Sequence, residues 1–93
     1  RLTQLRMKKN VSEYKMSLDL GNSKSYIQSI VSGRAMPSMT EFLYICDYLD
    51  VTPAEFFDEK IENPALLKNI IEKASEMGDD DLQLLCQLID RIK

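Results

Sequence analysis

Asn10 to Pro37, NVSEYKMSLDLGNSKSYIQSIVSGRAMP, constrains the fold more than any other stretch, because its glycines divide it into two short segments. Gly21 adopts a positive φ at little cost and predicts a tight turn, and Gly33 predicts the end of the second segment. Ser12 and Ser23 stand where a hydroxyl can cap the first amides of a helix. The stretch therefore predicts helices over 12–20 and 23–32 in the arrangement of a helix-turn-helix.

Capping signals elsewhere predict more helices and no strand. Residues 1–9 form a helix that ends at Asn10, which tolerates the left-handed conformation. Ser38-Met39-Thr40-Glu41 and Thr52-Pro53-Ala54-Glu55 are capping boxes that begin a helix over 38–49 and a short helix from 52. The side chains expected in the core are Leu2, Leu5, Met16, Leu20, Ile27, Ile30, Met39, Phe42, Leu43, Ile45, Cys46, Leu49, Phe56 and Phe57.

Two more amphipathic segments follow Asp58 and predict an antiparallel helical hairpin. Asn63-Pro64 begins the first, which Gly78 ends, and Asp79 caps the second. A hairpin of this length cannot bury both apolar faces by itself, so it docks either on the preceding helices or on a second chain. The apolar positions are Leu66, Leu67, Ile70, Ile71, Ala74, Met77, Leu82, Leu85, Leu88, Ile89 and Ile92.

Three motifs resemble the lambda-repressor/Cro-type (XRE) family. They are Ser-x-x-x-Met-Ser-x-x-Leu-Gly from Ser12, Ser-x-Ser-Tyr-Ile-x-x-Ile-x-x-Gly from Ser23, and Pro-Ser-x-x-x-x-Leu from Pro37. The resemblance implies an all-α protein, with a five-helix DNA-binding domain over 1–59 that precedes the helical hairpin over 60–93. It also implies a transcriptional regulator, usually a repressor of a bacterial, phage or mobile-element gene. Such a regulator binds double-stranded DNA as a homodimer, with its third helix in the major groove.

The resemblance places the base-reading positions on Lys24, Ser25 and Ser29, and helix periodicity adds Gln28 to the same outward face. Lys24 can donate to guanine O6 or N7, whereas serine hydroxyls discriminate weakly between bases. The groups expected at DNA phosphates are the side chains of Tyr26, Ser32 and Arg34 around the ends of the third helix, and the amide end of the second helix at Ser12. The alternative for each of these residues is a solvated polar side chain.

Two positions depart from the family pattern. Glu13 stands where the family usually has a glutamine that contacts a phosphate, and a carboxylate would repel it. An acid in the first turn of a helix also complements the helix dipole, which is the structural explanation for Glu13. Val31 replaces an acid that pairs in some relatives with an arginine of the first helix, and this leaves Arg6 free to face phosphate or solvent.

Charge is distributed unevenly along the chain. Residues 1–37 contain seven Lys and Arg and two acids, net +5, and residues 38–93 contain five and thirteen, net −8, which together give −3. The pI of 4.9 is far below the value above about 9 of a strongly basic DNA-binding domain. The positive end coincides with the predicted DNA-reading helix, and this favours DNA binding over two merely solvated faces of opposite sign.

The composition argues against an enzyme. The absence of histidine removes the commonest general base and a favoured metal ligand. Cys46 and Cys86 fit buried apolar positions, and Asp79-Asp80-Asp81 lacks the ligand spacing of a calcium loop. No apolar run is long enough for a membrane span. We therefore expect a cytoplasmic protein without catalytic residues, cofactor, metal or small-molecule ligand.

A protein-interaction module is the alternative function. An antitoxin that keeps this fold and binds a partner protein through the C-terminal hairpin is one example. Its hairpin would fold only in the complex, whereas the capping signals here favour a hairpin that folds by itself.

Overall fold

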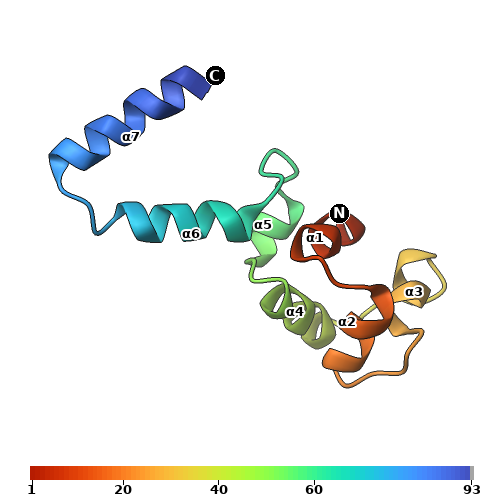
Figure 1. The fold of residues 1–93 in the computed structure, drawn as a ribbon. Coiled ribbons are helices and arrows are strands. Elements are labelled where there is room, and N and C mark those ends of the chain that lie inside the picture. The colour runs from red at the N-terminus through yellow and green to blue at the C-terminus, as the bar shows by residue number, and fades with distance from the viewer. Residues whose placement is uncertain (93) are drawn as a thin grey trace.

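The computed structural model describes residues 1–92, and within that range α-helix is the only regular secondary structure (Figure 1). The predicted all-α fold class is confirmed. The helices are α1 (Leu2–Lys9), α2 (Glu13–Asp19), α3 (Tyr26–Val31), α4 (Met39–Tyr48), α5 (Pro53–Phe57), α6 (Pro64–Ala74) and α7 (Asp79–Ile92).

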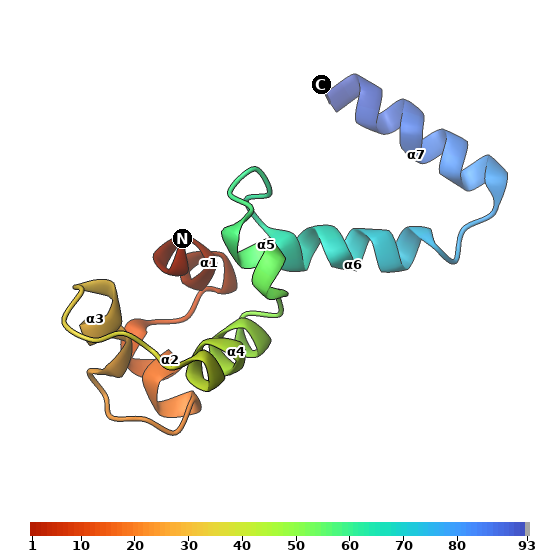
Figure 2. The same ribbon diagram turned by 180° about the vertical axis from the view of Figure 1, so that it is seen from behind.

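Helices α1 to α5 surround one small core, and α6 and α7 project away from it (Figures 1 and 2). Met16 and Ile27 are fully buried at its centre, and Ile45 is 2% exposed. Leu5, Cys46, Leu49 and Val51 complete the buried cluster. The molecule is elongated, with extents of 51 × 24 × 21 Å, because the two C-terminal helices extend beyond the body that α1 to α5 form.

The helix caps predicted at Ser12, Ser38 and Thr52 are confirmed, because they depend only on neighbouring residues. Ser38 Oγ accepts from the Glu41 amide at 3.1 Å, and Glu41 Oε1 accepts from the Ser38 amide at 2.9 Å. The same pair of bonds joins Thr52 and Glu55, at 3.1 and 2.8 Å. Ser12 Oγ accepts from the Lys15 amide at 2.9 Å, and this bond caps α2.

The predicted turn between α2 and α3 is also confirmed, since Gly21 has φ 78°. A Cβ at Gly21 would meet no atom within 4 Å, so a substitution there acts through backbone conformation alone. Gly21→Val should lower the free energy of unfolding by about 1–2 kcal/mol, the cost of a left-handed residue, and should weaken DNA binding with it. Urea unfolding measures the change, and Gly21→Asn is the control because asparagine tolerates this conformation. A valine variant as stable as the wild type would contradict the turn.

Several predicted boundaries and contacts are wrong. α3 begins at Tyr26 rather than at Ser23, and the N-cap residue Ser25 makes no capping hydrogen bond. α6 ends at Ala74, before Gly78, and Asp79 is the first residue of α7 rather than its cap. Periodicity gave the apolar face of each helix correctly but not how much of that face is covered. The residues predicted in the core that are instead exposed are Met39 (72%), Leu43 (47%) and Phe57 (71%), and Cys86 is exposed as well.

Arg1 connects α1 to the segment after α5, a contact that the sequence did not predict. Its Nε donates to the Phe56 carbonyl at 2.7 Å, and Nη2 donates to the carbonyls of Glu55, Asp58 and Ile61 at 2.8–2.9 Å. One guanidinium group thus donates to four backbone carbonyls at the end of α5 and in the segment that follows it. These bonds hold the chain that leads into α6.

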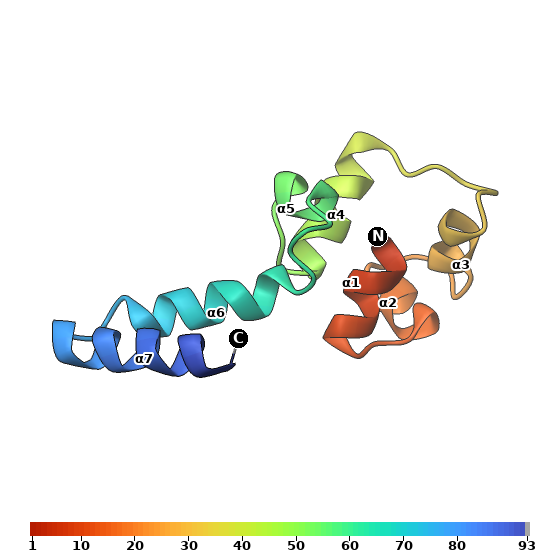
Figure 3. The same cartoon turned by 90° about the horizontal axis from the view of Figure 1, so that it is seen from above.

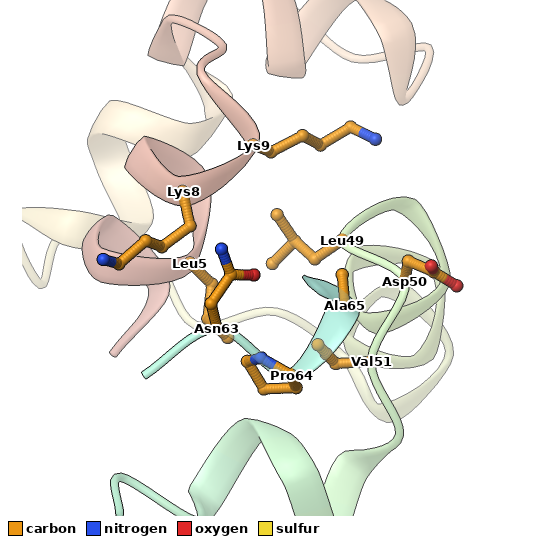
Figure 4. A pocket seen from close by; sticks show the side chains of 9 residues that line it. All are labelled: Leu5, Lys8, Lys9, Leu49, Asp50, Val51, Asn63, Pro64 and Ala65. Carbon is orange, nitrogen blue, oxygen red and sulfur yellow. The ribbon is translucent and has the colours of Figure 1, made fainter. Parts of the chain in front are cut away.

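The beginning of α6 is packed against the body formed by α1 to α5. Pro64 is buried, and Lys68 Nζ lies 3.8 Å from Asp50 Oδ1 and 4.0 Å from Glu55 Oε1. A cavity of about 140 Å³ lies at this junction, and Figure 4 shows it between the end of α1, the end of α4 and the start of α6. Its lining is mixed, with five apolar and four polar or charged residues, and the ammonium groups of Lys8 and Lys9 point away from it (Figure 4). We read it as a packing gap in the joint.

Beyond this joint, α6 and α7 form an arm, residues 64–92, that diverges from the body (Figures 1 and 3). The two helices run in opposite directions, but they open like a V from their connecting turn (Figures 1 and 2). Their apolar faces are exposed, with Ile71 at 58% and Leu88 at 53%. Within the chain, therefore, the arm does not dock on the body beyond the first turns of α6.

Candidate nucleic-acid interface

α2 and α3 form one braced unit, and the brace is Ser17. This serine is fully buried; its Oγ donates to the Glu13 carbonyl at 2.7 Å and accepts from the Ile27 amide at 3.0 Å. The Ile27 amide is one of the first amides of α3, which lack partners within the helix. Ser17, which lies on α2, therefore provides the acceptor for an amide at the start of α3. This hydrogen bond fixes the angle between the two helices.

Sequence reasoning overlooked Ser17 as a positioning residue. Its only local signal is a serine inside a helix, where the hydroxyl commonly bonds to the carbonyl four residues earlier. The contact with Ile27 depends on the tertiary packing of α3. It also explains why α3 needs no serine cap of its own.

The predicted base-reading residues lie on and just before α3. Lys24 and Ser25 are exposed in a turn in which the Tyr26 amide donates to the Ser23 carbonyl at 3.1 Å. They therefore precede the helix rather than forming its first turn. Gln28 is exposed on α3 itself, whereas Ser29 is half-buried, and its carbonyl accepts from the Arg34 amide at 2.9 Å.

Three of the predicted phosphate contacts already have internal partners. The Ser12 hydroxyl caps α2, and Ser32 Oγ donates to the Ser29 carbonyl at 3.2 Å. Tyr26 is half-buried, and its hydroxyl donates to Glu41 Oε2 at 2.9 Å. Burial, and then this hydrogen bond, raise the pKa of Tyr26 to about 12. The hydroxyl therefore remains protonated and joins α3 to α4.

Glu41 makes the stability of this region dependent on pH. Its pKa lies below the usual 4.5, because the Ser38 amide and then the Tyr26 hydroxyl donate to the carboxylate. A lowered folded-state pKa contributes stability above the unfolded-state value, and this is lost as pH falls through the folded-state pKa. We expect the free energy of unfolding to decrease as the pH is lowered below about 4.5. The decrease should be less steep in Glu41→Gln. Urea unfolding at several pH values tests this; identical acid profiles for the two proteins would contradict it.

Arg34 is the predicted phosphate ligand that remains most available. Its side chain is exposed just after α3, and among residues 1–92 its guanidinium has no hydrogen bond or ion pair. Lys24 is exposed at the opposite end of α3. The two cations therefore flank the helix, as a pair of contacts to the DNA backbone or to base edges would require.

The expectation that Arg6 is free to face phosphate or solvent is wrong. Arg6 is half-buried, and its Nη1 donates to the Val11 carbonyl at 2.7 Å. Its Nε is buried without a hydrogen-bond partner in the described part of the chain. The side chain closes the loop between α1 and α2 and so supports the start of α2.

Positive charge is less concentrated on this face than the sequence implied. Arg1 and Arg6 donate to backbone carbonyls, and Lys9 lies over the ring of Tyr48, 4.9 Å from its centroid. The Lys15 ammonium lies 3.4 Å from Asp19, one turn further along α2. The basic surface near α3 is therefore small.

Two other kinds of site are absent from residues 1–92. None of the helices within 1–92 is long and apolar enough to cross a membrane. The same range contains no cluster of three His, Cys, Asp or Glu side chains that could hold a metal ion, the acids at the start of α7 included.

The comparisons with known proteins agree with this architecture. A family model described as Helix-turn-helix matches residues 2–56. This range begins with α1 and ends one residue before the end of α5. Neither the curated proteins nor the solved structures contain a match. The matched segment includes the braced α2–α3 unit and most of the core. The chain belongs to the lambda-repressor/Cro-type (XRE) helix-turn-helix family of sequence-specific DNA-binding transcription regulators.

Proposed function

We propose that this protein is a repressor that binds a two-fold symmetric operator as a homodimer, with α3 in the major groove. The observation that carries the proposal is the braced α2–α3 unit, whose outer surface presents Lys24, Ser25 and Gln28 to solvent. A helix held at a fixed angle, with polar side chains at its start, is what major-groove reading needs. Occupation of a promoter by such a dimer is sufficient to exclude polymerase.

Lys24 and Gln28 are the main base readers in this proposal. Lys24 donates to guanine, and Gln28 pairs with adenine through its amide. Ser25 and Ser29 make weaker contacts, and Ser29 reaches least far because it is half-buried. The turn position of Lys24 suits this role, since residues at the start of a recognition helix lie closest to the base edges.

Arg34 is the main phosphate ligand, and Ser12, Tyr26 and Ser32 have supporting roles. The hydroxyls of Tyr26 and Ser32 donate their hydrogen within the chain, so each of these two would have to exchange its internal partner to donate to a phosphate oxygen. The Ser12 hydroxyl accepts its internal bond, so its hydrogen stays available. We therefore expect Arg34 to contribute more than any of the three.

Lys24→Ala should cost about 1–3 kcal/mol at the operator and relax the preference at one base position. Arg34→Ala should weaken binding to all sequences alike, because a phosphate carries no sequence information. Selection of binding sites from a randomised duplex pool, followed by fluorescence anisotropy, measures both effects. An unchanged selected site for Lys24→Ala, with only the salt slope altered, would make Lys24 a phosphate ligand.

A second candidate function is a protein-interaction module of the antitoxin type. The exposed apolar faces of the arm favour it, because they need a protein partner whether or not DNA is bound. The two functions differ in DNA affinity. A protein that binds no duplex of the randomised pool at low salt would be an interaction module and not an operator-binding repressor.

A further inference from the structure

We infer that the arm is completed by the arm of a second copy of this chain, so that two α6–α7 pairs form one four-helix bundle. The inference rests on the proposed function, since it supplies the contact between the two DNA-reading heads. It goes further by assigning the contact to particular residues and a particular orientation.

The open angle between α6 and α7 is the first observation. Figures 1 and 2 show the two helices separating from their turn, so that neither covers the other. Most of their large apolar side chains are exposed, from 41% at Met77 to 77% at Ile92, whereas Leu82 and Leu85 are half-buried. A face of this kind on a chain in water marks an interaction surface.

The length of α7 is the second observation. It contains 14 residues, and isolated helices of about 12–15 residues are marginal in water. Nothing from α1 to α5 packs along α7 in the fold (Figure 3). A stable α7 therefore requires another helix against its apolar face.

The pattern of that face identifies the partner as a like helix. Leu82, Leu85, Ile89 and Ile92 are spaced by three, four and three residues, which is the seam of a helix that packs on another helix. Two copies of this seam match when they run antiparallel about a two-fold axis. Leu82 then lies opposite Ile92 of the other copy, and Leu85 lies opposite Ile89.

The seam of α6 has the same spacing. Leu67, Ile70, Ala74 and Met77 are also separated by three, four and three residues, although Met77 lies just beyond the helix. Two seams from each chain provide the four apolar stripes that surround the core of a four-helix bundle. A partner with a single helix would leave one stripe uncovered.

Charge and size also fit a second copy. The acids of α7 lie in its first turn, at Asp79, Asp80 and Asp81, and Arg91 lies in its last turn. Antiparallel pairing brings the acidic end of one α7 towards the basic end of the other, and it aligns the two helix dipoles favourably. The two seams supply eight apolar residues from each chain to this interface.

The position of the arm permits such a bundle without obstructing DNA. α3 and α7 lie at opposite ends of the molecule in each view (Figures 1 and 3). A bundle formed by two arms would therefore leave both copies of α3 free to face the same side of a duplex.

Leu85→Asp/Ile89→Asp in the full chain should convert a dimer into a monomer in sedimentation at micromolar concentration. The matched control is Gln83→Asp/Gln87→Asp, which adds the same two charges on the polar face of α7 and should stay dimeric. Anisotropy with a single half-site at low salt should be similar for all three proteins. A seam variant that remains a dimer would overturn the inference, whereas loss of half-site binding by all three proteins would overturn the proposed DNA-binding function instead.

Cys86 provides a test that does not depend on disrupting the arm. It is exposed next to the seam and close to the predicted two-fold axis, whereas Cys46 is buried. A short bismaleimide should join two wild-type chains, and Cys86→Ser should abolish the product. A wild-type protein that is monomeric and does not cross-link would overturn the inference. The partner that covers the apolar faces of the arm would then be a different protein.

The orientation is tested by moving the thiol. In Asp81→Cys/Cys86→Ser, antiparallel pairing separates the two new thiols by about 18 Å along the helices, from a rise of about 1.5 Å per residue. Parallel pairing would place them side by side. No cross-link with the short reagent is expected, and an efficient one would overturn the antiparallel bundle.

Discussion

Arg1→Ala should lower the free energy of unfolding by about 2–3 kcal/mol, the range for losing hydrogen bonds to a charged group. The expected fall in melting temperature is roughly 10–20 °C for a domain of this size. Four carbonyls between Glu55 and Ile61 lose their shared donor, and the start of α6 loses its connection to α1. Thermal unfolding followed by circular dichroism at 222 nm measures the change.

Arg34→Ala is the matched control for this prediction. It removes the same side chain from an exposed position, and it should leave the melting temperature unchanged. Arg1→Lys keeps the charge but cannot serve several carbonyls with one planar group, so it should recover only a small part of the loss. If Arg1→Ala melts with the wild type, the carbonyl contacts contribute nothing to stability.

Raising the salt concentration from 50 to 200 mM should weaken operator binding by about 10²-fold, from a slope of about −0.9 per contact and about four phosphate contacts. Besides Lys24, which reads a base in this proposal, Lys15 and Arg34 are the cations on or beside α2 and α3 that face solvent, and a dimer doubles them. Release of counterions from the DNA then dominates the affinity. Fluorescence anisotropy with the selected operator at five or more salt concentrations measures the slope.

Arg34→Ala removes two of the four contacts in a dimer, so the same salt change should weaken its binding only about tenfold. Lys73→Ala, on the arm, is the control and should keep the wild-type slope. Binding that hardly responds to salt in the wild type would show that α2 and α3 do not lie against phosphates.

The features that the sequence predicted well are local. Ser38 and Glu41 are three residues apart and form both bonds of a capping box by themselves, and Gly21 and Asn10 take left-handed conformations that few other residues tolerate. Signals of this kind need no knowledge of the tertiary structure. They located each helix to within a few residues.

The features that the sequence did not predict depend on contacts between distant residues. α3 begins at Tyr26 because Ser17, ten residues away, accepts from the Ile27 amide and replaces the cap expected at Ser23. Arg1 finds its acceptors 54 to 60 residues along the chain. Neither contact leaves a mark in the periodicity of the sequence.

For the candidate site residues too, the sequence predicted local features but not contacts between helices. Exposure of Gln28 agrees with the outward face that helix periodicity predicts, whereas Ser29, predicted on the same face, is half-buried, and Lys24 and Ser25 are exposed in the turn before α3. The hydrogen bond from Tyr26 to Glu41 does not follow from the sequence, because it depends on how α3 and α4 pack. Their contacts with DNA remain predictions.

The packing of the first turns of α6 against the body would influence which operator spacing the dimer binds. Pro64 and Lys68 hold the first turns of α6 on the body that carries α3, so the arm begins at a defined position on the head. With the second copy in place, the angle at which α6 leaves the body determines the distance and the rotational phase between the two copies of α3. One residue inserted into α6 would turn the head by about 100° about the helix axis. The spacing of the operator halves would then be encoded in the arm and their base sequence in α3, so that either property could change while the other is kept.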